Sequence, residues 1–436
     1  MGLALCHLSV ACVAFNPRPL LPEKTVADFE GRSLGDPGLR QFLAGEKAAG
    51  GPWDVNRLAL AAAYFHPDVT LARAEADEMA AAIKTARMRP NPVLTFGPQF
   101  ASNHITPLTP WFLAGAVTVP IETAGKRGRR MEQALAAAEA ARWRVSTRAW
   151  AARSRVRAAM LEVHGARQNT ALLQSEQRLH EEAIKKLSAQ MEAGDVSPFE
   201  LTQARLMLNR TRLALQDAQR MEVTGESRLA AAVGVPLAAL RVARLDFSSF
   251  ARLPATGAGA ARRLALTRRA DLMALLADYA AAESALRLEI ARQYPDVRLG
   301  PGFDYNQGQN RWQLGISMDL PLNGNRGPVA QAEARRVTAE KRFVAQQLTV
   351  QGELDVALAA YRASRAKVET AASLSAEAVT AADTTKRVVD AGELSPLEHT
   401  RRQIEASTAK VALMAAEMEA QAAAGALEDA MQAPLR

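Results

Sequence analysis

Two stretches of β-prone sequence interrupt a chain that otherwise reads as alanine-rich helix. The first has extended segments at about residues 91–100 and 111–120, joined by a polar loop with prolines. The second has extended segments at about residues 295–305 and 312–321, joined by a loop at 306–311. A lone two-stranded hairpin is marginally stable at best in water. Each hairpin must therefore pair with something else.

The sequence after each hairpin predicts a long helical rod. Residues 126–192 contain no proline and would span about 100 Å as one helix. Apolar residues recur there in alternating steps of four and three, as at Val156, Ala159 and Val163, and the same pattern runs through residues 328–390. A sustained period of 3.5 residues makes helices wrap around one another. The rods are therefore predicted to form coiled coils.

Each rod ends in the same turn sequence, Gly-x-x-Ser-Pro, within residues 193–200 and 391–398. Gly194 and Gly392 suit the left-handed residue that follows a helix. A serine followed three residues later by glutamate predicts a capping box at the start of a returning helix. The predicted boxes are Ser197 with Glu200 and Ser395 with Glu398.

The two halves of the chain are in register. Val156 and Leu354 are separated by the same offset as Gly194 and Gly392, and the hairpins differ from that offset only slightly. Chance periodicity would not keep its phase in this way. The sequence therefore predicts an internal duplication.

The extended segments have the length of a membrane-spanning strand, about 9 to 11 residues when tilted. In lipid, strands persist only in a closed barrel, and membrane barrels begin at about eight strands. Four strands per chain are too few, so several chains must share one barrel. Three chains would supply twelve strands and a cylinder of helical columns. The alternative is a pair of soluble hairpins that cover helix ends.

This layout resembles the TolC family of outer-membrane efflux proteins over about residues 50–432. The resemblance rests on the duplicated unit, on Asn91-Pro92-Val93 and on the two turn sequences. It implies a mainly α fold with a small β part: a trimeric α-barrel of long coiled-coil helices plus four transmembrane strands per chain in a shared 12-stranded β-barrel. It also implies docking to a periplasmic adaptor (membrane fusion) protein.

A shorter stretch is most similar to the CzcC-like branch, whose members serve heavy-metal pumps of the resistance-nodulation-division (RND) type. The stretch reads Glu-Thr-Ala-Gly-Lys-Arg over residues 122–127. It implies an inner-membrane RND-type pump as a partner and possible heavy-metal cargo.

The expected division of the chain follows from the repeat and the resemblance. It comprises a signal- or lipoprotein-like segment (1–15), an extended N-terminal segment (16–52), a first repeat (53–233), an equatorial linker (234–262) and a second repeat (263–432). Residues 8–12 resemble a lipoprotein cleavage site, which makes Cys12 a candidate lipid anchor. The alternatives are an ordinary secretory signal cut near Ala14, or an inert cysteine.

No catalytic or cofactor-binding pattern was found in the sequence. The six histidines form no pair at metal-ligand spacing, and Gly125-Lys126-Arg127 lacks the serine or threonine and the first glycine of a phosphate loop. The net charge of +8 is spread along helix faces in alternating sign, which argues against nucleic acid as a partner. We expect no enzyme activity, no cofactor and no bound metal.

The turns supply the candidate functional residues at the free end of the helices. Asp195 and Glu393 would place six carboxylates there in a trimer, as a cation-attracting ring that contributes to gating. The alternative is that they stabilise the N-termini of the returning helices. The resemblance makes these the candidates for adaptor contact: Gly194, Val196, Ser197, Phe199, Gly392, Leu394, Ser395 and Leu397. For Phe199 and Leu397 the alternative is packing beneath the turn.

A basic cluster follows the first hairpin. Lys126, Arg127, Arg129 and Arg130 would lie at the inner surface of the membrane, where cations meet lipid phosphates. The alternative is a solvated first turn of the rod. Basic residues at the start of a helix interact unfavourably with its dipole, which favours contact with lipid phosphates over a solvated turn.

The predicted function is a passive exit duct of a tripartite efflux system in the bacterial outer membrane, with a periplasmic helical extension. The alternatives are a duct for type I protein secretion and a soluble periplasmic coiled-coil scaffold or adaptor.

Overall fold

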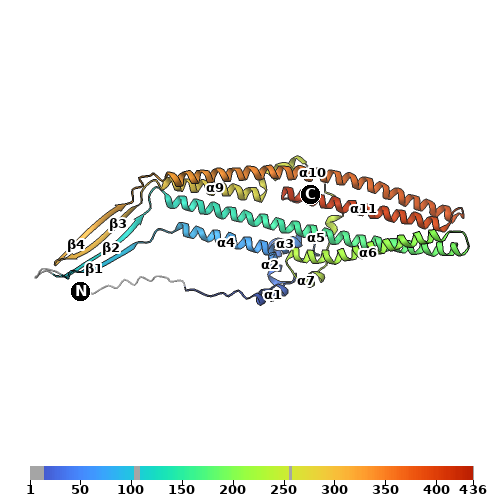
Figure 1. Cartoon of the computed structure of the whole chain (residues 1–436), viewed down its shortest axis with the longest axis horizontal. Helices are drawn as coiled ribbons and strands as arrows, with labels where there is room; N and C mark the ends of the chain where they lie inside the picture. Colours follow the sequence, from blue (N-terminus) through green and yellow to red (C-terminus); the bar gives the residue numbers. More distant parts are fainter. Residues whose placement is uncertain (1–13, 103–108, 255–257, 436) are drawn as a thin grey trace.

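The subunit is elongated, with a strand sheet at one end and long helices that run away from it (Figure 1). The computed structural model describes residues 14–102, 109–254 and 258–435. Both turns between long helices lie at the end opposite the sheet (Figure 1). Within the described residues, every helix is either too short or too polar to cross a membrane.

Four long helices carry most of the length: α5 (Lys126–Glu192), α6 (Pro198–Val233), α10 (Arg326–Asp390) and α11 (Pro396–Met431). In the half away from the sheet they pack in the order α6, α5, α11, α10. In the half near the sheet, α4 (Pro67–Arg87) and α9 (Ala270–Ala291) pack beside α5, and α9 also packs on α10. The helices therefore form one layer, four helices wide.

The predicted heptad residues form the contacts between these helices. Val156 and Val163 of α5 and Leu354 and Tyr361 of α10 are almost completely buried. They belong to two separate apolar clusters, one in each repeat. Burial of this periodic stripe stabilises a helix of such length, since helix propensity alone is weak.

Shorter elements gather beside the middle of the rods. They are α1 (Pro22–Glu30), α2 (Pro37–Gly45), α3 (Val55–Phe65), α7 (Leu237–Arg241), the 3₁₀ turn Ser248–Phe250 and α8 (Ala258–Arg268). Arg32 follows α1 and joins it to the ends of α3 and α6. Its Nη1 donates to the carbonyls of Phe65 and Gly234 at 3.1 and 2.9 Å. We call these elements the belt.

The expected extended segment at residues 16–52 contains two helices instead. Pro22 and Pro37 stand in the first turn of α1 and α2, where the fixed φ of proline favours helix and its missing N–H is not needed. Asp36 caps α2 by accepting a hydrogen bond from the Leu39 amide at 2.9 Å. The prolines therefore start helices rather than prevent them.

The sheet has four antiparallel strands in the order β1 (Val93–Phe100), β2 (Trp111–Ile121), β3 (Val297–Asn306) and β4 (Gln309–Met318). The two hairpins thus pair with each other through β2 and β3. The expected loop at 306–311 is shorter: Gln307 and Gly308 alone connect β3 and β4, both with positive φ (52° and 81°). Two such residues are typical of the tight turn that matches strand twist.

Candidate functional site

Strand register gives the sheet two chemically different faces. Residues paired across antiparallel strands point to the same face. Phe96, Gly115, Phe303 and Trp312 form one such row across all four strands. Exposed apolar side chains cover this face: Leu94, Phe96, Phe100, Trp111, Val117, Val119, Ile121, Trp312, Leu314, Ile316 and Met318.

The opposite face is built from polar or small residues, with Val93, Phe112 and Pro120 as apolar exceptions. Its members include Thr95, Gly97, Gln99, Ala114, Ala116, Thr118, Gly300, Gly302, Asp304, Asn306, Arg311, Gln313, Gly315 and Ser317. This division is typical of strands that face lipid on one side and an aqueous interior on the other. The alternation is weak along residues 93–100 and clearer along residues 313–320, and the pairing of the strands aligns it into two continuous faces.

Aromatic pairs mark the far end of the apolar face. The ring centroids of Phe100 and Trp111 lie 5.1 Å apart, and those of Phe303 and Trp312 lie 5.0 Å apart. Each pair joins neighbouring strands of one hairpin. Aromatic rings gather at the interface between membrane and water because they combine an apolar body with a polar or polarisable edge.

The near end of the sheet is fastened by a cluster that we call the base clasp: Thr123, Lys126, Tyr294, Pro295 and Asp296. Lys126 Nζ donates to Asp296 Oδ1 and to the Tyr294 carbonyl, both at 2.7 Å. Thr123 donates its amide to Asp296 Oδ1 at 2.9 Å and its hydroxyl to the Pro295 carbonyl at 2.6 Å. The clasp thus joins the end of β2 to the start of β3.

Electrostatics at the clasp favours the ionised carboxylate. Burial raises the pKa of Asp296, but hydrogen bonds from Lys126 and Thr123 outweigh burial and hold the pKa below its ordinary value. The sequence predicted Lys126 as a lipid-headgroup residue. The structure instead places Lys126 in the interior, 7% exposed, with its ammonium group bonded to protein oxygens.

The other three residues of the basic cluster differ in their bonding partners. Arg130 forms an ion pair with Glu122 at 2.6 Å and donates to carbonyls at the end of α4. Arg127 donates to the Arg87 carbonyl through Nε, and Arg129 pairs with Glu132 one turn along α5. Arg127 and Arg129 remain partly exposed.

The turns at the other end of the molecule have the predicted backbone shape. Gly194 and Gly392 have φ of +85° and +81°, in the left-handed region that favours glycine. The two turns pack together through Leu187, Leu201 and Leu397, all buried. Polar contacts add to this: Lys186 Nζ donates to the Thr400 hydroxyl at 2.7 Å and Gln190 to the Ser395 hydroxyl at 3.3 Å.

The predicted capping boxes do not form. Ser197 makes no side-chain cap bond, and Ser395 accepts from the Leu397 amide rather than from the third residue of the helix. Glu200 and Glu398 instead both pair with Arg401, at 3.3 and 3.7 Å. Arg401 lies between them in the packed turns, and a guanidinium binds a carboxylate more strongly than a backbone amide does.

The residues predicted to contact an adaptor differ in their exposure to solvent. Phe199 is 69% exposed and Leu394 is 44% exposed, whereas Leu397 is 6% exposed and packs beneath the turn. Val196 is half-buried against the same cluster. Ser197 and Ser395 are exposed.

The candidate gate residues Asp195 and Glu393 are both exposed in the turns. Across the described ranges, neither carboxylate has an ion-pair partner within 4 Å. The candidate lipid anchor Cys12 lies outside the residues that the structure describes.

Metal-binding geometry is absent from the described part of the chain, where no three His, Cys, Asp or Glu side chains converge to hold an ion. His180, which occupies a heptad core position, is 9% exposed and lies 3.7 Å from Glu176 one turn earlier.

The carboxylate of Asp296, which is central to the base clasp, was not singled out by the sequence. The only signal was an acid next to a proline at the start of an extended segment.

The fold and its two ends define a class of protein: a subunit of an outer-membrane channel, with a membrane sheet and a periplasmic helical extension. Residues 61–235 and 261–432 match the family described as outer membrane efflux protein. The chain belongs to this family, whose members are the non-enzymatic outer-membrane efflux channels of tripartite systems. The match decides against the soluble scaffold alternative.

Individual relatives are distant. The chain is 24% identical over 340 residues to the cobalt-zinc-cadmium resistance protein CzcC of Cupriavidus metallidurans, covering 77% of this chain and 79% of that protein. A membrane protein from Pseudomonas aeruginosa has a similar structure, with a TM-score of 0.71, 18% identity and coverage of 87% and 90%. The outer membrane protein VceC of Vibrio cholerae has a TM-score of 0.70, 17% identity and coverage of 88% and 97%.

Proposed function

We propose that three copies of this chain form one continuous duct, closed in the membrane by twelve shared strands. The observation that carries the proposal is the four-stranded sheet with one apolar face and two edges, β1 and β4. Unpaired strand edges are not tolerated in lipid, so each edge requires a partner. The β4 strand of one copy supplies the partner for β1 of the next.

The remaining parts take their roles from this arrangement. The apolar face contacts lipid chains, and the polar face lines the interior. Arg127 and Arg129 are the members of the basic cluster that can meet lipid phosphates, because Lys126 is buried and Arg130 is held by both Glu122 and the carbonyls at the end of α4, whereas the only ion pair of Arg129 in the described residues is with the exposed Glu132. The duct is passive, and an RND-type pump in the inner membrane supplies the energy.

At the end of the helices opposite the sheet, the packed turns contact a periplasmic adaptor protein. Phe199 and Leu394 are the proposed anchors, since both are large apolar side chains that the turns leave exposed, and exposed apolar surface often marks an interaction site. The heavy-metal cargo is proposed from the similarity to CzcC, and the unpaired carboxylates of Asp195 and Glu393 support it, because they would draw cations to the entrance.

The test uses the double variant Asp195→Asn with Glu393→Gln in single-channel recordings from planar bilayers. We expect the preference for cations over anions to fall, with little change in the size of the conductance. The matched control is Glu369→Gln, an exposed acid on α10 away from the turns. If the double variant keeps the selectivity of the wild type, the acidic ring has only a structural role.

A further inference from the structure

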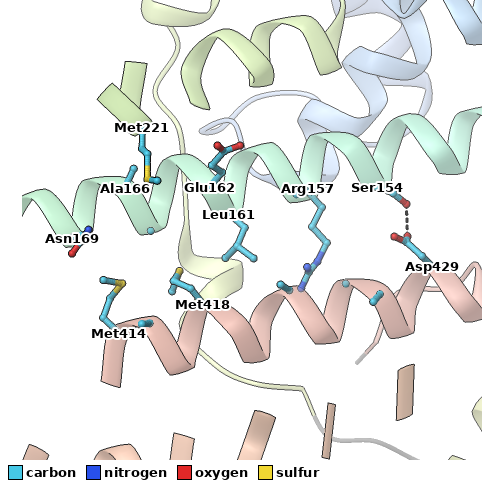
Figure 2. Close-up of a pocket in the computed structure, with 16 residues that line it drawn as sticks. Ser154, Arg157, Leu161, Glu162, Ala166, Asn169, Met221, Met414, Met418 and Asp429 are labelled. Carbon is cyan, nitrogen blue, oxygen red and sulfur yellow. Dashed lines mark hydrogen bonds between the residues drawn. The ribbon is translucent and has the colours of Figure 1, made fainter. Parts of the chain in front are cut away.

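A groove of ≈ 640 Å³ lies over the seam between α5 and α11, with Met221 of α6 at one end (Figure 2). Most of its lining is apolar or small, with Leu161, Met221, Met414 and Met418 as the large members. Gly165 allows α11 to approach, because a Cβ there would lie 3.1 Å from the Cγ of Met418. The groove belongs neither to the sheet nor to the turns.

The groove is in the middle of the helical layer, not at its edge. The layer order in this half is α6, α5, α11, α10, so the next copy in a trimer would meet α6 or α10. The other face of the same seam is covered by the belt: the His164 ring stacks on Phe247 at 5.0 Å, and Gln421 donates to the Phe250 carbonyl at 2.9 Å. The groove is therefore on the bare face of the layer.

The position of the groove in a trimer rests on the proposed function. A belt on the inside of the cylinder would obstruct the duct, so the belt must lie outside. The bare face then lines the interior. Cargo in transit would pass the groove about halfway along the helices.

One lining charge lacks a counter-ion. The Asp429 carboxylate accepts hydrogen bonds from Trp150 Nε1, at 3.1 Å, and from the Ser154 hydroxyl (Figure 2), and no cationic side chain of the described residues lies within 4 Å of it. Partial burial raises the pKa of Asp429, and the hydrogen bonds from Ser154 and Trp150 and the more distant charge of Arg153 oppose this rise only in part.

The other lining charges are already engaged. Glu162 pairs with Arg228. Arg157 is 9% exposed and turns into the seam, where it donates to the Gln421 carbonyl at 2.8 Å and lies 3.3 Å from Glu428. The groove thus offers an apolar surface with one available negative charge.

Size and shape indicate the class of ligand. The volume falls within the range of about 300 to 1,000 Å³ that is usual for drug-sized molecules, and is far larger than a metal ion needs. Methionine side chains adapt to irregular apolar shapes. We propose that this groove binds lipophilic organic cations, with Asp429 as the counter-ion and the three methionines as the apolar contact.

The probe is tetraphenylphosphonium, with the anion tetraphenylborate as its match in size and shape. Binding is measured by equilibrium dialysis against the full-length protein in lipid nanodiscs, after subtraction of binding to empty nanodiscs. We expect saturable binding of the cation and at least tenfold weaker binding in Asp429→Asn. Ala426→Phe, which fills the groove, should also reduce binding, and Glu369→Gln should not.

Equal binding of both probes, or cation affinity in Asp429→Asn within twofold of the wild type, would overturn the proposal. Thermal midpoints identify any variant that has lost its fold, and Ala426→Phe tests the groove independently of Asp429. Conductance in planar bilayers separates this inference from the duct itself. A protein that conducts but binds no cation refutes the groove alone, whereas one that does not conduct refutes the duct.

Discussion

Single side chains hold together parts of this molecule that are far apart in sequence. Lys126 and Asp296 are separated by 170 residues, yet their contact joins the two hairpins at the base of the sheet. Thr123 reinforces the same carboxylate. The stretch over residues 122–127 that resembles the CzcC-like branch therefore has a structural role here, because two of its members form the clasp.

Removal of the Lys126 charge should weaken the sheet. Lys126→Met removes the ammonium donor of Asp296 and leaves its carboxylate the hydrogen bond from the Thr123 amide, and a lost hydrogen bond to a charged group is worth about 1.5 to 3 kcal/mol. Thermal denaturation followed by circular dichroism should show a lower midpoint. The matched control is Arg129→Met, whose exposed pair with Glu132 is worth at most about 1 kcal/mol. Equal midpoints for the two variants would contradict a clasp.

The clasp should also give stability a dependence on pH. The pKa of Asp296 in the folded protein lies below its ordinary value of 3.8, so ionised Asp296 contributes stability above that value and loses it as pH falls through the lowered pKa. The difference in thermal midpoint between the wild type and Asp296→Asn should be widest near neutral pH and close below about pH 4. A constant difference across this range would mean that the charge of Asp296 contributes nothing.

At the scale of elements, some residues in the turns at the end of the rods pack inside the protein, and others are exposed to a partner. Leu397 and Leu201 are buried in one cluster with Leu187, whereas Phe199 extends into solvent from the first turn of α6. Helix ends that pack on each other in this way hold the exposed residues in fixed positions. A partner protein would then meet a surface that is already ordered.

Two substitutions should separate these roles. Leu397→Ala should lower the stability of the turns by about 2 to 5 kcal/mol, because it removes buried apolar volume. Phe199→Ala should leave the thermal midpoint unchanged but weaken capture by the adaptor, measured by crosslinking from a cysteine at Ser197. If Phe199→Ala crosslinks like the wild type with every adaptor of the host, the contact does not depend on Phe199.

The sequence predicts best those features that depend on residues close together in the chain. The heptad positions of Val156 and Tyr361 and the positive φ of Gly194 and Gly392 depend on neighbours within a few turns, and the structure has them as predicted. The capping boxes failed because Arg401 of α11 pairs with both glutamates: with Glu200 across the two repeats and with Glu398 one turn away on its own helix. Neither Asp296 nor the groove could be found, since their partners lie more than 160 residues away.

At the scale of the whole molecule, the sheet has an apolar and a polar face that run across both hairpins. Leu314 and Gln313 are neighbours in β4, yet they point to the apolar and the polar face respectively. The same division continues through β1, β2 and β3. Alternation along each strand sets the direction of a residue, and the pairing of β2 with β3 aligns the faces of the two hairpins.

Arginine at these two neighbouring positions should have opposite outcomes. Leu314→Arg places a charge on the lipid face, at a cost of about 2 to 4 kcal/mol near the middle of the membrane. It should reduce the amount of protein recovered in the outer-membrane fraction. Gln313→Arg should assemble normally and change only ion selectivity. Equal recovery of both variants would contradict the assignment of the faces.

The two open edges of the sheet have a consequence for how the protein is made. If three copies share one barrel, as proposed, a subunit that inserts alone leaves rows of amide and carbonyl groups without partners in lipid, and we expect membrane insertion to be coupled to subunit association. Resistance to unfolding would then depend on protein concentration, as for any obligate complex. The number of working pores would then fall more steeply than the number of copies made, because each pore needs three of them.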